Sequence, residues 1–182
     1  MPLFDPLRDF FQRRQATRLD ALAQDLDLVT QRRDAQRGHF VFPGPDIAAS
    51  VQLAGQHVGW INYGVSPLED RIYISEFDIE PTYQRRGLGL ASLWWLWRQY
   101  QMPLTPMHEV GTSVGFWEKA RKRFAGAGVE LTKDIRTGDQ ESEQQRWQHL
   151  VPESEHERLI REYWEWVEAE RAAGREAGPG IR

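Results

Sequence analysis

The segment from Gln84 to Gly89 combines two arginines with two glycines. It follows a run of β-forming residues, 71–79, and precedes an apolar, Trp-rich run, 90–97, that is typical of a buried helix. The first N–H groups of a helix have no partner within it and lie at the positive end of its dipole, and glycine leaves them accessible. The segment therefore predicts a site for an anion, typically a phosphate, at a helix N-terminus.

Two carboxylates lie just before that segment. Glu76 and Asp78 are two residues apart on the expected strand, so they point to the same face of it. A carboxylate in a substrate cleft can act as a general base and take a proton from an attacking amine. The pattern fits equally well with either carboxylate pairing with a neighbouring arginine or facing solvent.

His108 is a third candidate, because its imidazole lies just before an expected helix and can exchange a proton near neutral pH. Glu109 follows it, and adjacent residues of a strand point to opposite faces, so the two should not form a pair. No two histidines have metal-ligand spacing with a supporting carboxylate, so no metal site is expected. The chain has no cysteine, which excludes disulfides and a cysteine nucleophile.

The elements that must position these residues begin with a helical pattern. Asp5 as N-cap, Pro6 at the first helical position and apolar residues at helical spacing predict one long helix that ends before Gly38. Short β-forming runs divided by glycine and proline then predict three antiparallel strands before the one at 71–79. The three runs are 39–42, 47–53 and 56–63.

Beyond the Trp-rich helix the pattern is mixed. Residues 102–110 contain a short candidate strand, a helix is expected from Val114 to about Ala127, and 129–132 is a candidate for a late strand.

The C-terminal part of the chain is more polar. Residues 134–145 are expected to be an exposed or poorly ordered loop. A capping-box pattern from Ser154 to Glu157 predicts a final helix, and the residues from Ala172 to Arg182 are expected to be frayed.

These patterns predict an α/β (α+β) fold with a mixed, mostly antiparallel sheet flanked by helices and extra helices at both termini. One domain over 1–182 is expected, with an N-terminal helix at 1–36, a core at 39–132, and a polar loop and C-terminal helix at 133–182. The net charge of −4 does not suggest nucleic acid as a partner. Because no signal peptide or membrane-spanning stretch is evident, a cytoplasmic location without membrane attachment is expected.

The motif at 84–89, Gln-Arg-Arg-Gly-Leu-Gly, resembles the acetyl-CoA-binding signature of the GNAT acyltransferase superfamily. The preceding run, Phe77-Asp-Ile79-Glu-Pro81-Thr-Tyr83, is similar to the one that leads into this signature in many members. The resemblance covers residues 39–128. It implies a GNAT-like fold, acetyl-CoA as co-substrate, and transfer of the acetyl group to an amine.

The resemblance also implies which residues bind the co-substrate. The main chain of Phe77 and Ile79 would pair with the pantetheine arm. Main-chain N–H groups of the loop would converge on the pyrophosphate, and the arginine side chains would add charge-assisted bonds. The loop residues so implied are Gln84, Arg85, Arg86, Gly87, Leu88 and Gly89. The other interpretation of the loop is an ordinary strand-to-helix turn with solvated arginines.

The sequence departs from the family in the helix after the fifth strand. Many members have a tyrosine there, in a run like Phe-Tyr-Glu-Lys, whereas this chain has Trp117 in the run Phe-Trp-Glu-Lys. Trp117 could fill the space beside the cofactor sulfur or belong to the core. Thr112 or Ser113 replaces the family's frequent asparagine, and its hydroxyl could bind the pantetheine or cap the helix. The candidates for catalysis are Glu76, His108 and Asp78.

The expected function is acetyl-CoA-dependent N-acetyltransfer to an amine of a small molecule or protein, by direct attack. The alternative is a non-catalytic GNAT-like module that binds acyl-CoA or a protein partner, with the terminal helices as an interface. The aromatic residues Tyr163, Trp164 and Trp166 favour this alternative, and they are interpreted either as packing contacts or as contacts of a homodimer. Binding of nucleic acid through a basic patch is a third interpretation.

Overall fold

Residues 5–175 are described in the computed structural model, which separates into two units, Met1–Leu150 and Val151–Arg182. The first unit contains the sheet and the second contains the C-terminal helix. The fraying expected at 176–182 lies outside the described residues.

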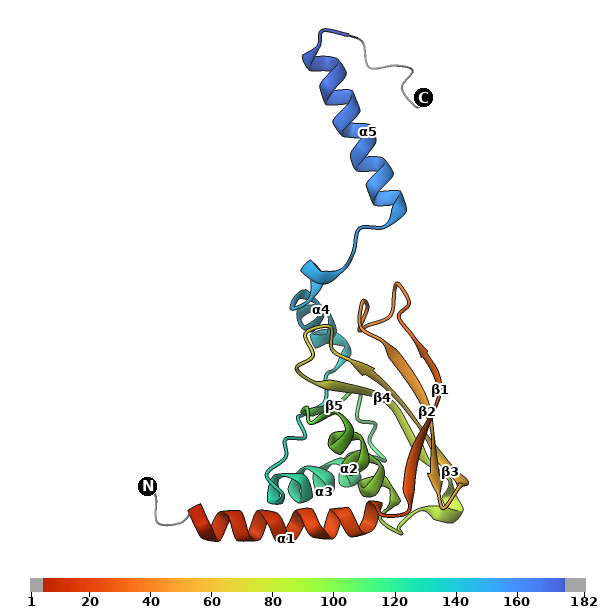
Figure 1. Ribbon diagram of the computed structural model, residues 1–182, viewed down its shortest axis with the longest axis vertical. Coiled ribbons are helices and arrows are strands. Elements are labelled where there is room, and N and C mark those ends of the chain that lie inside the picture. The colour runs from red at the N-terminus through yellow and green to blue at the C-terminus, as the bar shows by residue number, and fades with distance from the viewer. Residues whose placement is uncertain (1–4, 176–182) are drawn as a thin grey trace. The chain divides into compact units, whose positions relative to one another are not determined.

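The first unit is built on a five-stranded sheet in the order β1-β2-β3-β4-β5 (Figure 1). Neighbouring strands are antiparallel except for β4 and β5, which are parallel. The expected mixed, mostly antiparallel sheet is therefore confirmed. The strands are β1 (Leu26–Asp34), β2 (Asp46–Leu53), β3 (Gln56–Val65), β4 (Ile72–Ile79) and β5 (Leu104–Pro106).

Three helices of the first unit pack on one another and share a core with all five strands. These helices are α1 (Asp5–Ala23), α2 (Leu88–Tyr100) and α3 (Val114–Gly126). The α2 residue Trp94 joins them, since its indole N–H donates to Asp20 of α1 (2.9 Å) and its ring meets Phe124 of α3 edge-on (5.5 Å between centroids). The Trp-rich helix is thus buried against helices as well as strands.

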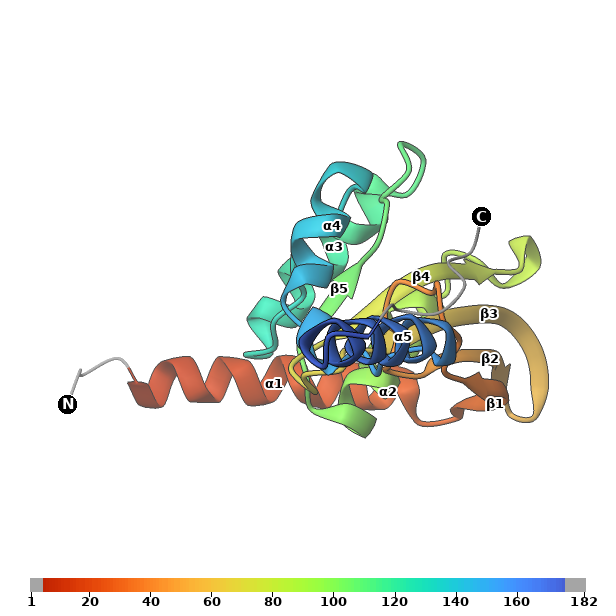
Figure 2. The same ribbon diagram turned by 90° about the horizontal axis from the view of Figure 1, so that it is seen from above.

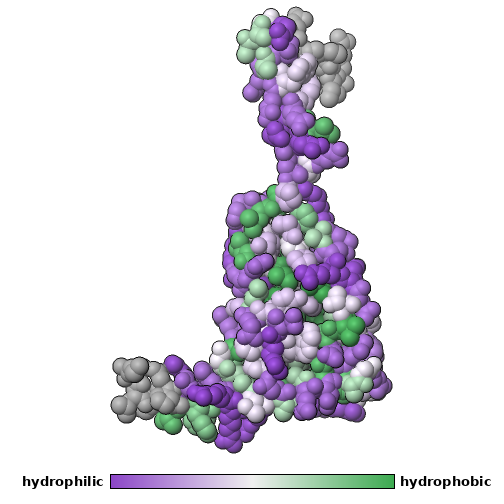
Figure 3. Space-filling model, in the orientation of Figure 1, coloured by the Kyte–Doolittle hydropathy of each residue, from purple (hydrophilic) through white to green (hydrophobic). Residues whose placement is uncertain are grey.

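The N-terminal half of α1 projects beyond the helices on which the rest of α1 packs (Figures 1 and 2). Leu19 and Ala23, near its end, are buried, whereas Leu7, Phe10 and Phe11 are 56–59% exposed. Hydrophobic side chains are visible on this part of the surface in Figure 3.

A second, smaller cluster covers the opposite face of β4. Tyr73 alternates with Ile72 and Ile74, so its side chain points away from the main core. Its ring packs against Phe40 and Trp147, with centroids 5.0 and 5.6 Å away.

The prediction of one long N-terminal helix to 36 is wrong. The helix ends at Ala23, and the following residues form β1 instead. Leu26 and Leu28 are buried while Asp27 between them is exposed, which is the two-residue period of a strand. Pairing with β2 therefore overrides the helical spacing of the leucines.

The prediction of a strand at 39–42 is also wrong, because these residues form turns. The Nδ1 atom of His39 lies 2.6 Å from a carboxylate oxygen of Asp46, and the Gly44 N–H donates to the carbonyl of Val41 (2.6 Å). The prolines at 43 and 45 deprive this segment of two ladder donors.

The segment 134–145, expected as an exposed or poorly ordered loop, contains helix α4 (Thr137–Gln145). Polar contacts made by Glu143 hold this polar helix against the rest of the first unit. Glu143 accepts a hydrogen bond from the Tyr73 hydroxyl (2.6 Å) and pairs with Arg146 (2.5 Å). The late strand expected at 129–132 is reduced to an isolated parallel bridge between Leu104 and Leu131.

The second unit consists of helix α5 (Glu155–Ala172) and the residues that flank it. The predicted capping box is confirmed: the Ser154 hydroxyl accepts from the Glu157 N–H (3.2 Å), and the Glu157 carboxylate accepts from the Ser154 N–H (2.7 Å). These bonds satisfy two backbone donors at the start of the helix.

Candidate functional site

The site begins where β4 loses its neighbour on one side. The β4–β5 pairing covers Ile72 to Ile74 only. Immediately after this pairing, the register between β3 and β4 shifts by one residue. Tyr63 pairs with Ile74, whereas its neighbour Asn62 pairs with Glu76. Ser75 is the extra residue of this bulge, and bulges bend a strand and change its twist. The bulge therefore lies where β4 and β5 separate.

The main chain of β4 beyond the bulge has donors and acceptors on its open edge. The N–H of Glu80 donates to the Val58 carbonyl of β3 (2.9 Å). In a strand, the N–H and C=O groups of one residue point to the same edge, and those of the next residue point to the other edge. Phe77 and Ile79 therefore direct their N–H and C=O groups away from β3. The Ile79 carbonyl accepts a hydrogen bond from the Gln84 side chain (2.8 Å).

The loop after β4 opens the N-terminus of α2. A short 3₁₀ turn, η1 (Pro81–Tyr83), leads to Arg85 and Gly87, which have positive φ values of 61° and 86°. Gly87 is the N-cap of α2 and no side chain caps the helix. Because the first helical bond runs from the Ala91 N–H to the Gly87 carbonyl, the N–H groups of residues 88–90 have no acceptor within the helix.

Glycine suits the two positions of the motif for different structural reasons. Gly87 supplies the left-handed conformation that side-chain-bearing residues adopt at a cost. Gly89 has an ordinary φ, but a Cβ atom on it would lie 2.9 Å from the ring of Phe116 in α3. Gly89 therefore permits α2 and α3 to approach closely.

A cavity of about 630 Å³ lies over these elements. Nine of the predicted site residues line it, together with five others. The predicted residues are Phe77, Asp78, Ile79, Gln84, Arg85, Gly87, Leu88, Gly89 and Ser113. The others are Tyr83, Leu90, Thr112, Phe116 and Lys119. The cavity thus joins the open edge of β4, the N-terminus of α2 and the first turns of α3.

The two carboxylates of β4 differ in their relation to the cavity. Asp78 is one of its lining residues, whereas Glu76 lies outside it. Both side chains are exposed on the same face of the strand. Glu76 accepts a hydrogen bond from the Asn62 amide (2.7 Å), and Asp78 lies opposite Trp60 in the β3–β4 register.

Three other predicted residues are not among those that line the cavity. His108 is exposed and its Nε2 lies 2.7 Å from the Thr137 hydroxyl. Arg86 extends over the ring of Tyr83 (5.4 Å to the centroid). Trp117 is buried and packs against Phe116, which agrees with its interpretation as a core residue.

Of the lining residues outside the predicted set, Phe116 and Lys119 come from α3, far along the chain from the loop. Phe116 meets Phe77 with 5.9 Å between ring centroids. Lys119 is exposed and one helical turn further along than Phe116. With Arg85 it gives the cavity two cationic side chains. The sequence of α3 contains four basic residues between 119 and 123, and only the packing of α3 against α2 selects Lys119 from them.

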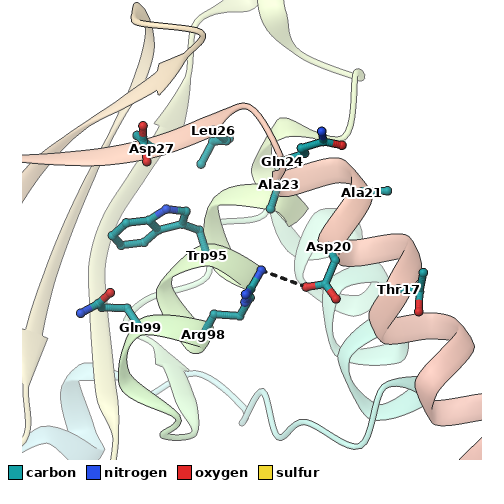
Figure 4. A pocket seen from close by; sticks show the side chains of 10 residues that line it. All are labelled: Thr17, Asp20, Ala21, Ala23, Gln24, Leu26, Asp27, Trp95, Arg98 and Gln99. Carbon is teal, nitrogen blue, oxygen red and sulfur yellow. Dashed lines mark hydrogen bonds and ion pairs between the residues drawn. The ribbon is translucent and has the colours of Figure 1, made fainter.

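A second cavity, of about 710 Å³, lies between the end of α1, the start of β1 and α2 (Figure 4). Trp95 forms one wall of this cavity. Two other lining residues, Asp20 and Arg98, form an ion pair (3.2 Å). Since Asp20 also binds Trp94, this carboxylate holds α1 to α2. The residues that line this cavity include none of the predicted site residues.

Within residues 5–175, no cluster of three or more histidine or acidic side chains could hold a metal ion. No helix in this described part of the chain is long and apolar enough to cross a membrane. Comparison with models of protein families gave no match, and comparison with curated protein sequences gave none either.

Proposed function

We propose that the chain is a GNAT-like N-acetyltransferase that binds acetyl-CoA in the 630 Å³ cavity and transfers the acetyl group to an amine. The observation that carries the proposal is the combination of three features in that cavity. These are an open strand edge, an uncapped helix N-terminus and two cationic side chains, Arg85 and Lys119.

Each part of acetyl-CoA has a chemically suitable counterpart in the cavity. The pyrophosphate suits the N–H groups of residues 88–90, at the positive end of the α2 dipole, with Arg85 beside them. The amide-containing pantetheine arm suits the main chain of Phe77 and Ile79, as an added strand suits a sheet edge. Ser113 also lines the cavity, and its hydroxyl donates to the Val110 carbonyl (2.9 Å).

The transfer requires an attacking amine and a base. The amine lone pair forms a bond to the thioester carbonyl carbon, the carbon–sulfur bond breaks, and one proton of the amine passes to the base. Asp78 is the first candidate because it lines the cavity, and Glu76 is the second because it shares the same strand face. His108 is engaged with Thr137, so we assign it no part in the proton transfer.

The alternative function, an acyl-CoA-binding module that does not catalyse transfer, is favoured by one observation. Trp117 stands where a tyrosine would supply a phenolic proton, and it is buried. The phenol that does line the cavity, Tyr83, lies under the Arg86 guanidinium. If transfer does occur, the proton for the departing CoA thiolate would come from solvent, because the Ser113 hydroxyl already donates to the Val110 carbonyl.

Titration calorimetry with acetyl-CoA tests the binding step. We expect Lys119→Glu to weaken binding by about tenfold or more, because a charged hydrogen bond contributes about 1.5–3 kcal/mol and 1.4 kcal/mol is a factor of ten. Lys122→Glu is the matched control, since Lys122 is on the same helix and exposed but does not line the cavity. Absence of binding, or equal effects of the two variants, contradicts both functions.

Release of the CoA thiol then separates the two functions. A thiol reagent can be used without background because the protein has no cysteine. N-acetyltransfer predicts thiol release with at least one member of an amine panel, reduced in Asp78→Asn. Tight binding of acetyl-CoA without release across the panel supports the non-catalytic module.

A further inference from the structure

The outward side of α1 carries an apolar patch followed by positive charge. Leu7, Phe10 and Phe11 have the spacing of one helix face, and that face is turned away from the side on which Leu19 and Ala23 are buried. Among residues 5–150, nothing covers the patch, since all three side chains are more than half exposed. Large aromatic residues exposed together mark interaction surfaces.

Two arginines extend this patch along the same helix face. Arg14 and Arg18 lie seven and eleven residues after Leu7, so they continue its row along α1. Both are exposed, and neither has an ion-pair partner among the described residues. Residues 7–18 contain four arginines and one aspartate, a net charge of +3. We call this surface the α1 face.

Helix α5 carries a surface of the opposite charge. Its large apolar side chains recur at helical spacing, as in an amphipathic helix, and are 37–55% exposed. They are Leu159, Ile160, Tyr163, Trp164 and Trp166. The aromatic rings touch, with 5.6 Å between the centroids of Tyr163 and Trp164 and 6.0 Å between those of Tyr163 and Trp166. We call this surface the α5 face.

The charges beside the α5 face are mainly negative. Residues 151–175 contain seven glutamates and four arginines, a net charge of −3. Arg158, Arg161 and Arg175 are each paired with a glutamate of this unit. Glu155 and Glu168 have no ion-pair partner among the described residues.

We propose that α5 of one copy of the chain packs on α1 of a second copy, with the aromatic α5 face on Leu7, Phe10 and Phe11. The two surfaces match in apolar character and have opposite net charges of equal size. Tryptophan and tyrosine are the residues that most often dominate interface energies. Because each copy offers both surfaces, two such contacts related by a two-fold axis form a closed dimer.

Analytical ultracentrifugation of the full chain over a wide range of concentrations tests the proposal. We expect a mass twice that of the chain at micromolar concentrations. The double variant Phe10→Ser/Phe11→Ser should raise the dissociation constant by about tenfold or more, the effect of removing one strong interface residue. Leu68→Ser is the control, because it removes an exposed apolar side chain outside both surfaces.

Charge reversal tests the choice of partner surface. Arg14→Glu/Arg18→Glu should weaken the dimer, and adding Glu155→Arg/Glu168→Arg should restore it. Far-UV circular dichroism should show all variants folded, because every substituted side chain is exposed. A monomer at all concentrations, a dimer indifferent to the phenylalanine variant, or a reversal that is not restored overturns the proposal.

Discussion

Replacement of Gly89 by alanine tests the close approach of α2 and α3 that forms the floor of the cavity. The added Cβ would lie 2.9 Å from Cε2 and 3.2 Å from Cζ of Phe116. The Phe116 ring cannot move freely, because it also packs against Phe77 and Trp117. Gly115 provides a matched control, since it is likewise the second residue of its helix and a Cβ there meets nothing within 4 Å.

Two effects of opposite sign decide the magnitude. Alanine in place of glycine in a helix stabilises the fold by about 0.5–1 kcal/mol. Forcing an extra methyl group into a packed site costs about 1–3 kcal/mol. At Gly115 only the first effect acts, so that variant should be more stable than the wild type by about 0.5–1 kcal/mol. At Gly89 the second effect prevails, and we expect a net loss of about 1 kcal/mol.

Urea denaturation measures both free energies of unfolding, and acetyl-CoA titration measures the effect on the cavity. A displaced Phe116 ring should narrow the cavity, so Gly89→Ala should also bind acetyl-CoA more weakly, while Gly115→Ala should not. In the double variant Gly89→Ala/Phe116→Leu, the smaller side chain should relieve the clash. The two substitutions should therefore be coupled, with about 1 kcal/mol of the free energy of unfolding regained. If Gly89→Ala is as stable as Gly115→Ala, the reasoning about this contact is refuted.

Two further predictions concern the polar contacts that hold α4. Glu143→Ala should destabilise the protein by about 2–3 kcal/mol, because the buried Tyr73 hydroxyl loses its acceptor. Thermal denaturation measures this loss. The control is Glu141→Ala, an exposed neighbour on α4, whose stability should lie within about 0.5 kcal/mol of the wild type. Burial raises the pKa of Asp70, but hydrogen bonds to Arg146 and Ser66, together with the positive charges of Arg146 and Arg71, outweigh burial and hold that pKa below its usual value. The charged form therefore stabilises the fold above the unfolded pKa of about 3.9, and this stability is lost as the pH falls through the lower folded value. As the pH is lowered, the free energy of unfolding should fall less steeply in Asp70→Asn than in the wild type. Identical pH profiles of the two proteins would rule out this contribution.

The sequence by itself determined the strand, glycine loop and helix at 71–100 and the capped helix from Ser154. These signals are local: a β-forming run ends at Pro81, Gly87 permits a left-handed turn, and a hydroxyl and carboxylate three residues apart cap a helix. Such features depend on neighbours within a few residues, so they can be recognised without knowledge of the rest of the chain.

The tertiary structure alone decided which residues share the cavity. It turned 26–34 into β1 by pairing with β2, and it held the polar segment 137–145 as a helix through contacts with Tyr73. It also placed Phe116 and Lys119 beside the loop and left Glu76 and His108 outside the lining. These outcomes depend on contacts between segments far apart in sequence, and the energies of such contacts exceed local preferences of a fraction of a kcal/mol. The local conformation of the glycine loop was therefore predictable, but the residues that line the cavity around it were not.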